Sequence, residues 1–416
     1  MLPKLGKGMS MEAVKPLRVA ASAAHTESGG GFLPRINRAL RIAPLALCAA
    51  LALPFAARGE TWYNTRVKNG QDETAADKCL AGDPGLWTNS VGVTATSFNT
   101  DDLYVVSGGQ QMRMGTATTL LTFAGGTLRF GNNGTDGNFR QDCYEALSFP
   151  YGLILERGKY LFNFTSAVGD VRFGALNGGT VTVAASEQNP FLLYPAVNNR
   201  FFVVQNDIAT ESASNVLSLG GEATNFTFSA MGDLSGYTGR IVVDYTGSGD
   251  HRWATRLLLG ATTMPGTIQV KGKTAISACS ATWGKWRYAA TWPTRSPCVC
   301  TVGSLEMASG SVICVEGENK TSTKAATNGL IRVSTAFSAS SPVYVKPSWA
   351  IEVTKENPDV TVLTVPASQG LDKTDFTLDT TGLTLPQELA LDVRSEGAVK
   401  KLVITKKGMG LAIFVR

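Results

Sequence analysis

Histidine and charged side chains are both scarce in this chain, and each scarcity excludes a class of protein. Only 17% of the 416 residues are charged and 44% are apolar, which excludes a disordered chain and provides for a large core. After residue 59 the only histidine is His251. A Ser-His-Asp triad or a histidine metal site would depend on it, and the preceding Gly247-Ser248-Gly249 indicates a polar turn instead. The sequence predicts no catalytic residue, metal site or cofactor.

A second absence is that of long amphipathic helices, because no stretch after Gly59 keeps a helical period over three turns. What recurs instead is a short sequence motif. It consists of a glycine, then a threonine or serine, and then residues of which every second one is apolar. The copies are 126–130, 179–183, 266–270 and 303–307, with a looser copy at 239–243. Each predicts a turn glycine followed by a short strand with one buried face. Such strands bury their apolar faces when many coils stack, so we expect an all-β solenoid, with a β-sandwich pair as the alternative.

The N-terminal stretch has the pattern of an export signal. An arginine-rich segment, 35–41, precedes an apolar run, 42–57, which leads to the small-x-small sequence Ala57-Arg58-Gly59. The run is too short for a comfortable membrane span, so we expect a signal peptide over 1–59 and no transmembrane span after it. That segment holds eight Lys or Arg and two Glu, so its removal takes the formal charge from +5 to about −1. Export and this balance together argue against nucleic acid as a partner.

The remaining chain has a weakly marked domain boundary near residue 345. Pro342, Pro347 and Pro358 thin the strand pattern there. We therefore predict a solenoid domain over 60–345 and a small C-terminal β cap over 346–416.

Export also determines how the cysteines are interpreted. An even number of cysteines in an exported chain favours disulfides, and six allow 15 pairings. Closeness in sequence favours one bond between the first two and two more among the last four. The alternative is a zinc site from the last four, although their Cys-x-Cys spacing is unusual for zinc. The six candidates are Cys79, Cys143, Cys279, Cys298, Cys300 and Cys314.

One segment concentrates basic and aromatic residues. Between Asp250 and Glu306 the chain has no acidic residue, seven basic ones and four of its seven tryptophans. Flat aromatic faces beside cations are suited to gripping a sugar chain, especially an acidic one. The alternative is that the aromatics cover an exposed end of the solenoid, with solvated cations around them. The candidate glycan-binding residues lie in the loop 279–298 and are Trp283, Lys285, Trp286, Arg287, Tyr288 and Trp292.

A family resemblance rests on one well-formed motif. The sequence Gly232-Asp233-Leu234-Ser235-Gly236-Tyr237-Thr238-Gly239 leads into the strand-like 240–243 and resembles the repeat of autotransporter-associated β-strand proteins. Trp87, followed by Asp101-Asp102 and Tyr104-Val105-Val106, is similar to the first coil of such passengers. The resemblance implies a right-handed parallel β-helix at a bacterial cell surface and brings no catalytic residues. After residue 345 we expect no membrane-embedded barrel, so the resemblance is to the passenger part.

Taken together, these features predict an exported, non-enzymatic surface or matrix protein, adhesive or in contact with a polysaccharide or cell-envelope glycan. The alternative is a polysaccharide lyase or hydrolase built on a β-helix, which would need carboxylates or an Arg/Lys base on one face. The candidates for such chemistry are weak. Asp101-Asp102 falls at an expected structural turn, and Asp170 with Arg172 is typical of a surface ion pair.

Overall fold

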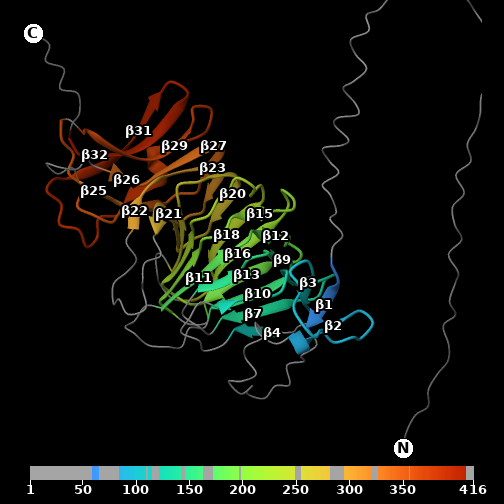
Figure 1. The fold of residues 1–416 in the computed structure, drawn as a ribbon. Coiled ribbons are helices and arrows are strands. Elements are labelled where there is room, and N and C mark those ends of the chain that lie inside the picture. The colour runs from blue at the N-terminus through green and yellow to red at the C-terminus, as the bar shows by residue number, and fades with distance from the viewer. Residues whose placement is uncertain are drawn as a thin grey trace, which may run out of the picture. The chain divides into compact units, whose positions relative to one another are not determined.

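The computed structural model describes residues 59–64, 84–108, 111–114, 121–141, 146–162, 172–195, 198–248, 254–281, 295–319, 327–355 and 357–408. Within these residues every regular element is a strand, apart from the short 3-10 turns η3 (Pro84–Leu86) and η4 (Lys373–Asp375). Long sheets of parallel strands run along the molecule, so the prediction of an all-β parallel solenoid is confirmed (Figure 1). No helix in this part of the chain is long and apolar enough to cross a membrane. Residues 1–58 of the predicted signal peptide lie outside the described ranges.

Three sheets, here A, B and C, are formed by successive coils of the chain. Sheet A has the spatial order β15 (Ile208–Thr210), β12 (Val181–Val183), β9 (Leu153–Leu155), β6 (Thr127–Phe130), β3 (Leu103–Val106), β1 (Thr61–Asn64) and β2 (Trp87–Asn89).

Sheet B is the longest of the three. Its spatial order is β31 (Leu389–Glu396), β32 (Val399–Lys406), β29 (Asp359–Pro366), β27 (Leu330–Ala339), β23 (Val299–Met307), β20 (Thr263–Val270), β18 (Arg240–Tyr245), β16 (Val216–Gly221), β13 (Phe191–Pro195), β10 (Gly158–Phe162), β7 (Gly137–Gln141) and β4 (Gln111–Met114).

Sheet C runs beside it with the order β30 (Phe376–Leu378), β28 (Val343–Pro347), β24 (Val312–Val315), β21 (Thr274–Ala281), β19 (Thr255–Leu259), β17 (Phe226–Ala230), β14 (Arg200–Val204), β11 (Arg172–Gly178), β8 (Ala146–Phe149) and β5 (Leu121–Thr122). Outside this order, β22 (Arg295–Pro297) pairs with the end of β21, and β25 (Gly317–Glu318) pairs with β26 (Thr327–Asn328).

The coils stack in register, so that apolar side chains of successive coils meet inside the solenoid. In sheet B one such column runs from Leu217 through Ile241 and Ile268 to Leu305 and Phe337. All five are buried. This column shows why short strands suffice, since each one buries its inward face against the coils on both sides.

An aromatic column supports the N-terminal half of the core. The rings of Phe139 and Tyr160 lie 4.5 Å apart in a T-shaped arrangement. Tyr160 continues to Phe202 at 5.6 Å, and Phe202 to Phe228 at 6.1 Å. Edge-on and tilted pairs of this kind each contribute about 0.5–1.5 kcal/mol beyond the area that they bury.

The repeated glycines lie where neighbouring coils come closest. A Cβ atom on Gly266 would collide with the carbonyl oxygen of Gly239 in the preceding coil, and one on Gly303 would collide with that of Pro265. Gly266 and Gly303 lie inside β20 and β23, which begin at Thr263 and Val299, so the expectation that these glycines precede their strands is wrong. Both strands change register there, between Met264 and Thr267 and between Val302 and Ser304. These glycines therefore make room for the backbone of the previous coil where the pairing register shifts.

The motif at 232–239 forms a turn between β17 and β18. It lies one coil beyond β15, the last strand of sheet A. Leu234 and Tyr237 are buried, and the Tyr237 hydroxyl donates to the Arg240 carbonyl at 2.8 Å. Asp233 accepts hydrogen bonds from the Ser235 hydroxyl at 2.5 Å and the Ser235 amide at 2.9 Å, which lower the pKa of its carboxyl group. The Leu234 amide donates to Thr262 in the next coil at 3.1 Å. The motif is thus a structural turn joined to the following coil.

The outward faces of sheets B and C differ. Strands of sheet B alternate between buried and more exposed residues, as in β18 and β13. Sheet C is buried on both faces through β14, β17 and β24. Its outward side chains form hydrophobic clusters separate from the central core, and the larger cluster contains Phe201, Val203, Leu258, Cys279 and Ala281. Sheet C therefore lacks the single buried face that the glycine pattern predicts for its own strands in sheets A and B.

The two ends of the solenoid are built differently. At the N-terminal end, Asp102 is buried and accepts hydrogen bonds from the Trp62 indole at 2.7 Å and the Glu60 amide at 2.8 Å. At the C-terminal end, β32 pairs antiparallel with both β29 and β31. Two parallel strands, β29 and β30, lie beyond the predicted boundary at 345.

Candidate functional site

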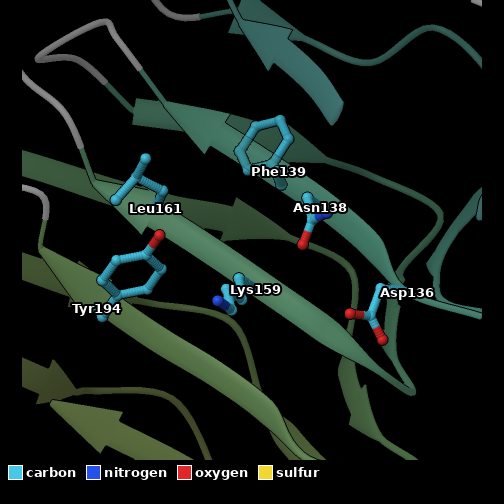
Figure 2. Close-up of a pocket in the computed structure, with 6 residues that line it drawn as sticks. All are labelled: Asp136, Asn138, Phe139, Lys159, Leu161 and Tyr194. Atoms are coloured by element: carbon cyan, nitrogen blue, oxygen red, sulfur yellow. The ribbon is translucent and has the colours of Figure 1, made fainter. Parts of the chain in front are cut away.

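A groove opens on the outward face of sheet B, in the N-terminal half of the solenoid. It has a volume of about 210 Å³. Figure 2 shows its lining side chains on three neighbouring strands, β7, β10 and β13, or next to them. These residues are Asp136, Asn138, Phe139, Lys159, Leu161 and Tyr194.

The register of the coils brings the groove together. Asn138 of β7 pairs with Lys159 of β10, and two residues further along Leu161 pairs with Tyr194 of β13. These four side chains share the outward face because strand residues alternate between the faces, whereas Phe139 points into the core. The groove thus crosses three coils and spans about 10 Å, since adjacent strands lie about 4.8 Å apart.

An ion pair and a hydrogen bond of Arg157 fix one end of the groove. The Arg157 Nε atom donates to Asp136 Oδ1 at 2.6 Å, and its Nη1 atom donates to Asn189 at 2.8 Å. Lys159, the neighbouring cation, is exposed and has no ion-pair partner among the described residues. The groove therefore presents an uncompensated ammonium group beside a carboxylate that is already paired.

Tyr194 provides the aromatic surface of the groove. Burial raises the pKa of its hydroxyl group, and the nearby Arg140 guanidinium partly opposes this change. The hydroxyl group is therefore a neutral donor and acceptor at ordinary pH. Gly221 lies against the tyrosine, because a Cβ atom there would be 3.3 Å from the Cβ atom of Tyr194. The glycine leaves room for this side chain to lie over the sheet.

The described lining of the groove offers aromatic, aliphatic, amide and charged contacts. Among the residues that the structure describes, Asp136 is the only carboxylate that lines it, and no histidine does. Hydrolysis by the usual glycosidase route uses two carboxyl groups, one as acid and one as base or nucleophile. Among the described residues, no three histidine, cysteine or acidic side chains gather as metal ligands.

The predicted aromatic and basic loop lies outside the described residues. This holds for all six of its candidate residues, Trp283, Lys285, Trp286, Arg287, Tyr288 and Trp292. The structure describes the base from which the loop leaves sheet C. There β21 and β22 pair antiparallel, with Cys279 opposite Pro297 and Ala281 opposite Arg295. The role of the loop stays a prediction.

The cysteines that the structure describes are Cys279, Cys298, Cys300 and Cys314, and none of these four is in a disulfide. Two disulfides among them are therefore not confirmed. Cys300 lies in the central core, and Cys279 and Cys314 lie in two separate outer clusters. Among the described residues no three metal-ligating side chains gather, so the alternative of a zinc site gains no support from these four. Cys79 and Cys143 lie outside the described residues.

Burial accounts for the chemistry of the two neighbouring thiols. It raises the pKa of both Cys298 and Cys300, so each remains a protonated thiol. The Cys298 thiol donates to the Leu259 carbonyl oxygen at 3.4 Å.

The acidic residues considered for an enzyme do not assemble into a site. Asp102 is held in the hydrogen bonds that close the first coil, and Asp101 beside it is exposed. Asp170, Asp250 and His251 lie outside the described residues, as does the side chain of Arg172.

Sequence reasoning missed the groove. Its residues come from three coils, and nothing in the sequence sets the register between them. The local signal was the alternation of Lys159, Tyr160 and Leu161, which places the first and third on one face. That signal predicts an outward lysine but not the tyrosine that lies beside it.

The chain matches no known protein-family model and no curated protein sequence.

Proposed function

We propose that this protein is an exported, non-enzymatic β-solenoid of the cell surface or matrix, which binds glycans through the groove on sheet B. The observation that carries the proposal is the combination of Tyr194, Leu161 and Lys159 on one open face. A flat ring and an aliphatic side chain suit the apolar face of a sugar, and the polar groups around them suit its hydroxyls.

The shape of the groove supports a polymer rather than a small metabolite. Its volume of about 210 Å³ is below the usual range of about 300–1,000 Å³ for small-molecule pockets. An open site of this size contacts a short stretch of a longer chain. Each contact of this kind is weak, but the overall affinity rises when many copies of the protein bind one polymer.

The test is retention of the purified chain on a panel of neutral and acidic polysaccharides, with new chain ends scored in the same samples. We expect retention without cleavage, and we expect Tyr194→Ala to lower it strongly. Tyr344→Ala is the matched control, because Tyr344 is a partly buried tyrosine on sheet C, away from the groove. New reducing or unsaturated ends would instead support the polysaccharide-degrading alternative.

The loop 279–298 has a test of its own. Substitution of Trp283, Trp286 and Trp292 by alanine is expected to reduce retention if the loop contributes, because it removes three flat aromatic faces. Retention that is lost in this variant and kept in Tyr194→Ala would place binding in the loop and contradict the groove.

A further inference from the structure

We propose that the groove on sheet B selects acidic glycans, with Lys159 binding the carboxylate of a sugar whose ring lies on Tyr194. This inference rests on the proposed function and names the class of its ligand. It follows from the balance of charge in the groove, from the position of the Tyr194 ring, and from the absence of an ion pair between Lys159 and any described residue.

The charges around the groove are mostly positive. Among the described residues, Arg157 and Lys159 lie on or next to it, and Asp136 is the one carboxylate in its lining. Asp136 is held by Arg157, so its charge is already compensated. Glu187, which lies between β12 and β13, is paired with Arg240 of β18 at 2.7 Å and adds little net field. An acidic ligand is therefore attracted to this face, and a neutral one is not.

Lys159 is the residue that binds the carboxylate of the ligand. Its side chain is exposed and forms no ion pair with any described residue, so binding an anion breaks no existing contact. In Figure 2 it lies between Asn138 and Tyr194. An ammonium group donates up to three hydrogen bonds, and charge-assisted bonds to a carboxylate are about twice as strong as neutral ones.

Tyr194 and Leu161 position the sugar ring. They pair directly across β10 and β13 and form the apolar part of the lining. Lys159 is two residues from Leu161 on the same strand face, about 6.6 Å along the strand, so its long side chain can reach the edge of a ring stacked on this pair. A uronic acid carries its carboxylate at the edge of the ring, so one sugar can reach both contacts.

The experiment compares a polyuronic acid with the same polymer after chemical reduction of its carboxyl groups to alcohols. The full chain is measured against both at low and physiological salt. We expect the polyuronic acid to bind roughly tenfold more tightly, and this difference to shrink as salt screens the charges. The reduced polymer isolates the carboxylate, because backbone and linkage are unchanged.

Three variants assign the effect to the groove. Lys159→Gln is expected to remove most of the preference for the acidic polymer and to leave binding of the reduced polymer unchanged. Lys159→Arg should restore the preference, since it restores the charge. Lys355→Gln is the control, because Lys355 is an exposed lysine elsewhere on the chain. Circular dichroism checks that each variant is folded.

The outcomes separate the two proposals. Equal binding of both polymers, with no effect of Lys159→Gln, would overturn this inference and leave the proposed function standing. Absence of binding to every polysaccharide would overturn both. Single-stranded DNA held as tightly as the polyuronic acid would show a general anion site and would also overturn the inference.

Discussion

Sheets B and C belong to the same coils, yet they use their outward faces in opposite ways. Sheet B alternates buried and open positions and carries the groove, whereas β14, β17 and β24 of sheet C are buried on both faces. On sheet C even Ser229 and Ser277 are fully buried. The comparison teaches that stacking of the coils determines which side chains of each strand face the core. The side chains that face outward can form either a binding surface or a second packed layer.

The largest expected effect comes from removing an outward side chain of sheet C. Leu258 is fully buried in the outer cluster, so Leu258→Ala should lower the free energy of unfolding by about 2–5 kcal/mol. Val242 faces outward on sheet B and is only partly buried, so Val242→Ala should cost less than about 1 kcal/mol. Urea unfolding measures both. Equal losses would mean that the two outward faces do not differ.

A second prediction concerns how closely the coils of sheet B approach each other beneath their open face. Gly266→Ala would place a Cβ atom against the Gly239 carbonyl oxygen, and we expect a loss of about 1–3 kcal/mol in unfolding free energy. Gly370→Ala is the matched control, because a Cβ atom there meets nothing within 4 Å and the substitution restricts the unfolded chain. If both variants unfold at the wild-type urea midpoint, the coils do not approach this closely.

A third prediction uses the buried hydroxyls of sheet C. Ser277 Oγ has no hydrogen-bond partner among the described residues, so Ser277→Ala removes a buried polar group at little cost. We expect a gain of about 1 kcal/mol, seen as a higher melting temperature. Ser218→Ala, at a partly buried outward position of sheet B, should change stability by less than about 0.5 kcal/mol. A lower melting temperature for Ser277→Ala would indicate that its hydroxyl group has a partner.

The smallest expected effect is a pH dependence at the C-terminal end of sheet C. Burial alone would raise the pKa of Asp379, but hydrogen bonds from Thr381 and the Lys346 ammonium group outweigh it and lower the pKa. A depressed carboxyl pKa contributes stability above its unfolded value of about 4, and this stability is lost as the pH falls through the folded value. We therefore expect Asp379→Asn to be less stable at pH 7 and to lose less on acidification.

Melting temperatures between pH 7 and pH 2 measure this effect. Glu388→Gln is the control, because its ion pair with Lys407 is well exposed and contributes little. The same acid-induced loss in Asp379→Asn and in the wild-type chain would remove Asp379 as the cause.

Much of the fold could be predicted from local patterns. The strands expected within 126–130, 179–183 and 266–270 are observed as β6, β12 and the second half of β20. Each consists of apolar residues that alternate or run together, and such patterns act over the length of one strand. The short motifs also pointed to stacked coils, because no strand of three or four residues buries its apolar side chains alone.

The features that local patterns did not predict depend on contacts with neighbouring coils. Gly266 was interpreted as a residue that precedes its strand, but it lies within β20, where the preceding coil leaves no space for a side chain. The continuous apolar run 201–204 lies in β14, which is buried on both faces, and no local pattern indicates what covers its outward face. In each case the deciding contact comes from a segment at least twenty residues away, which a local pattern does not contain.

By itself, the sequence determined that the chain is a β-solenoid, because alternation and turn residues act within single strands. Only the tertiary structure decided where a binding surface lies. Lys159 and Tyr194 are more than thirty residues apart, and they share a groove because parallel pairing puts β10 beside β13 in one register. A shift of that register by one residue would turn one of them into the core, so their meeting is a property of the stack and not of either strand.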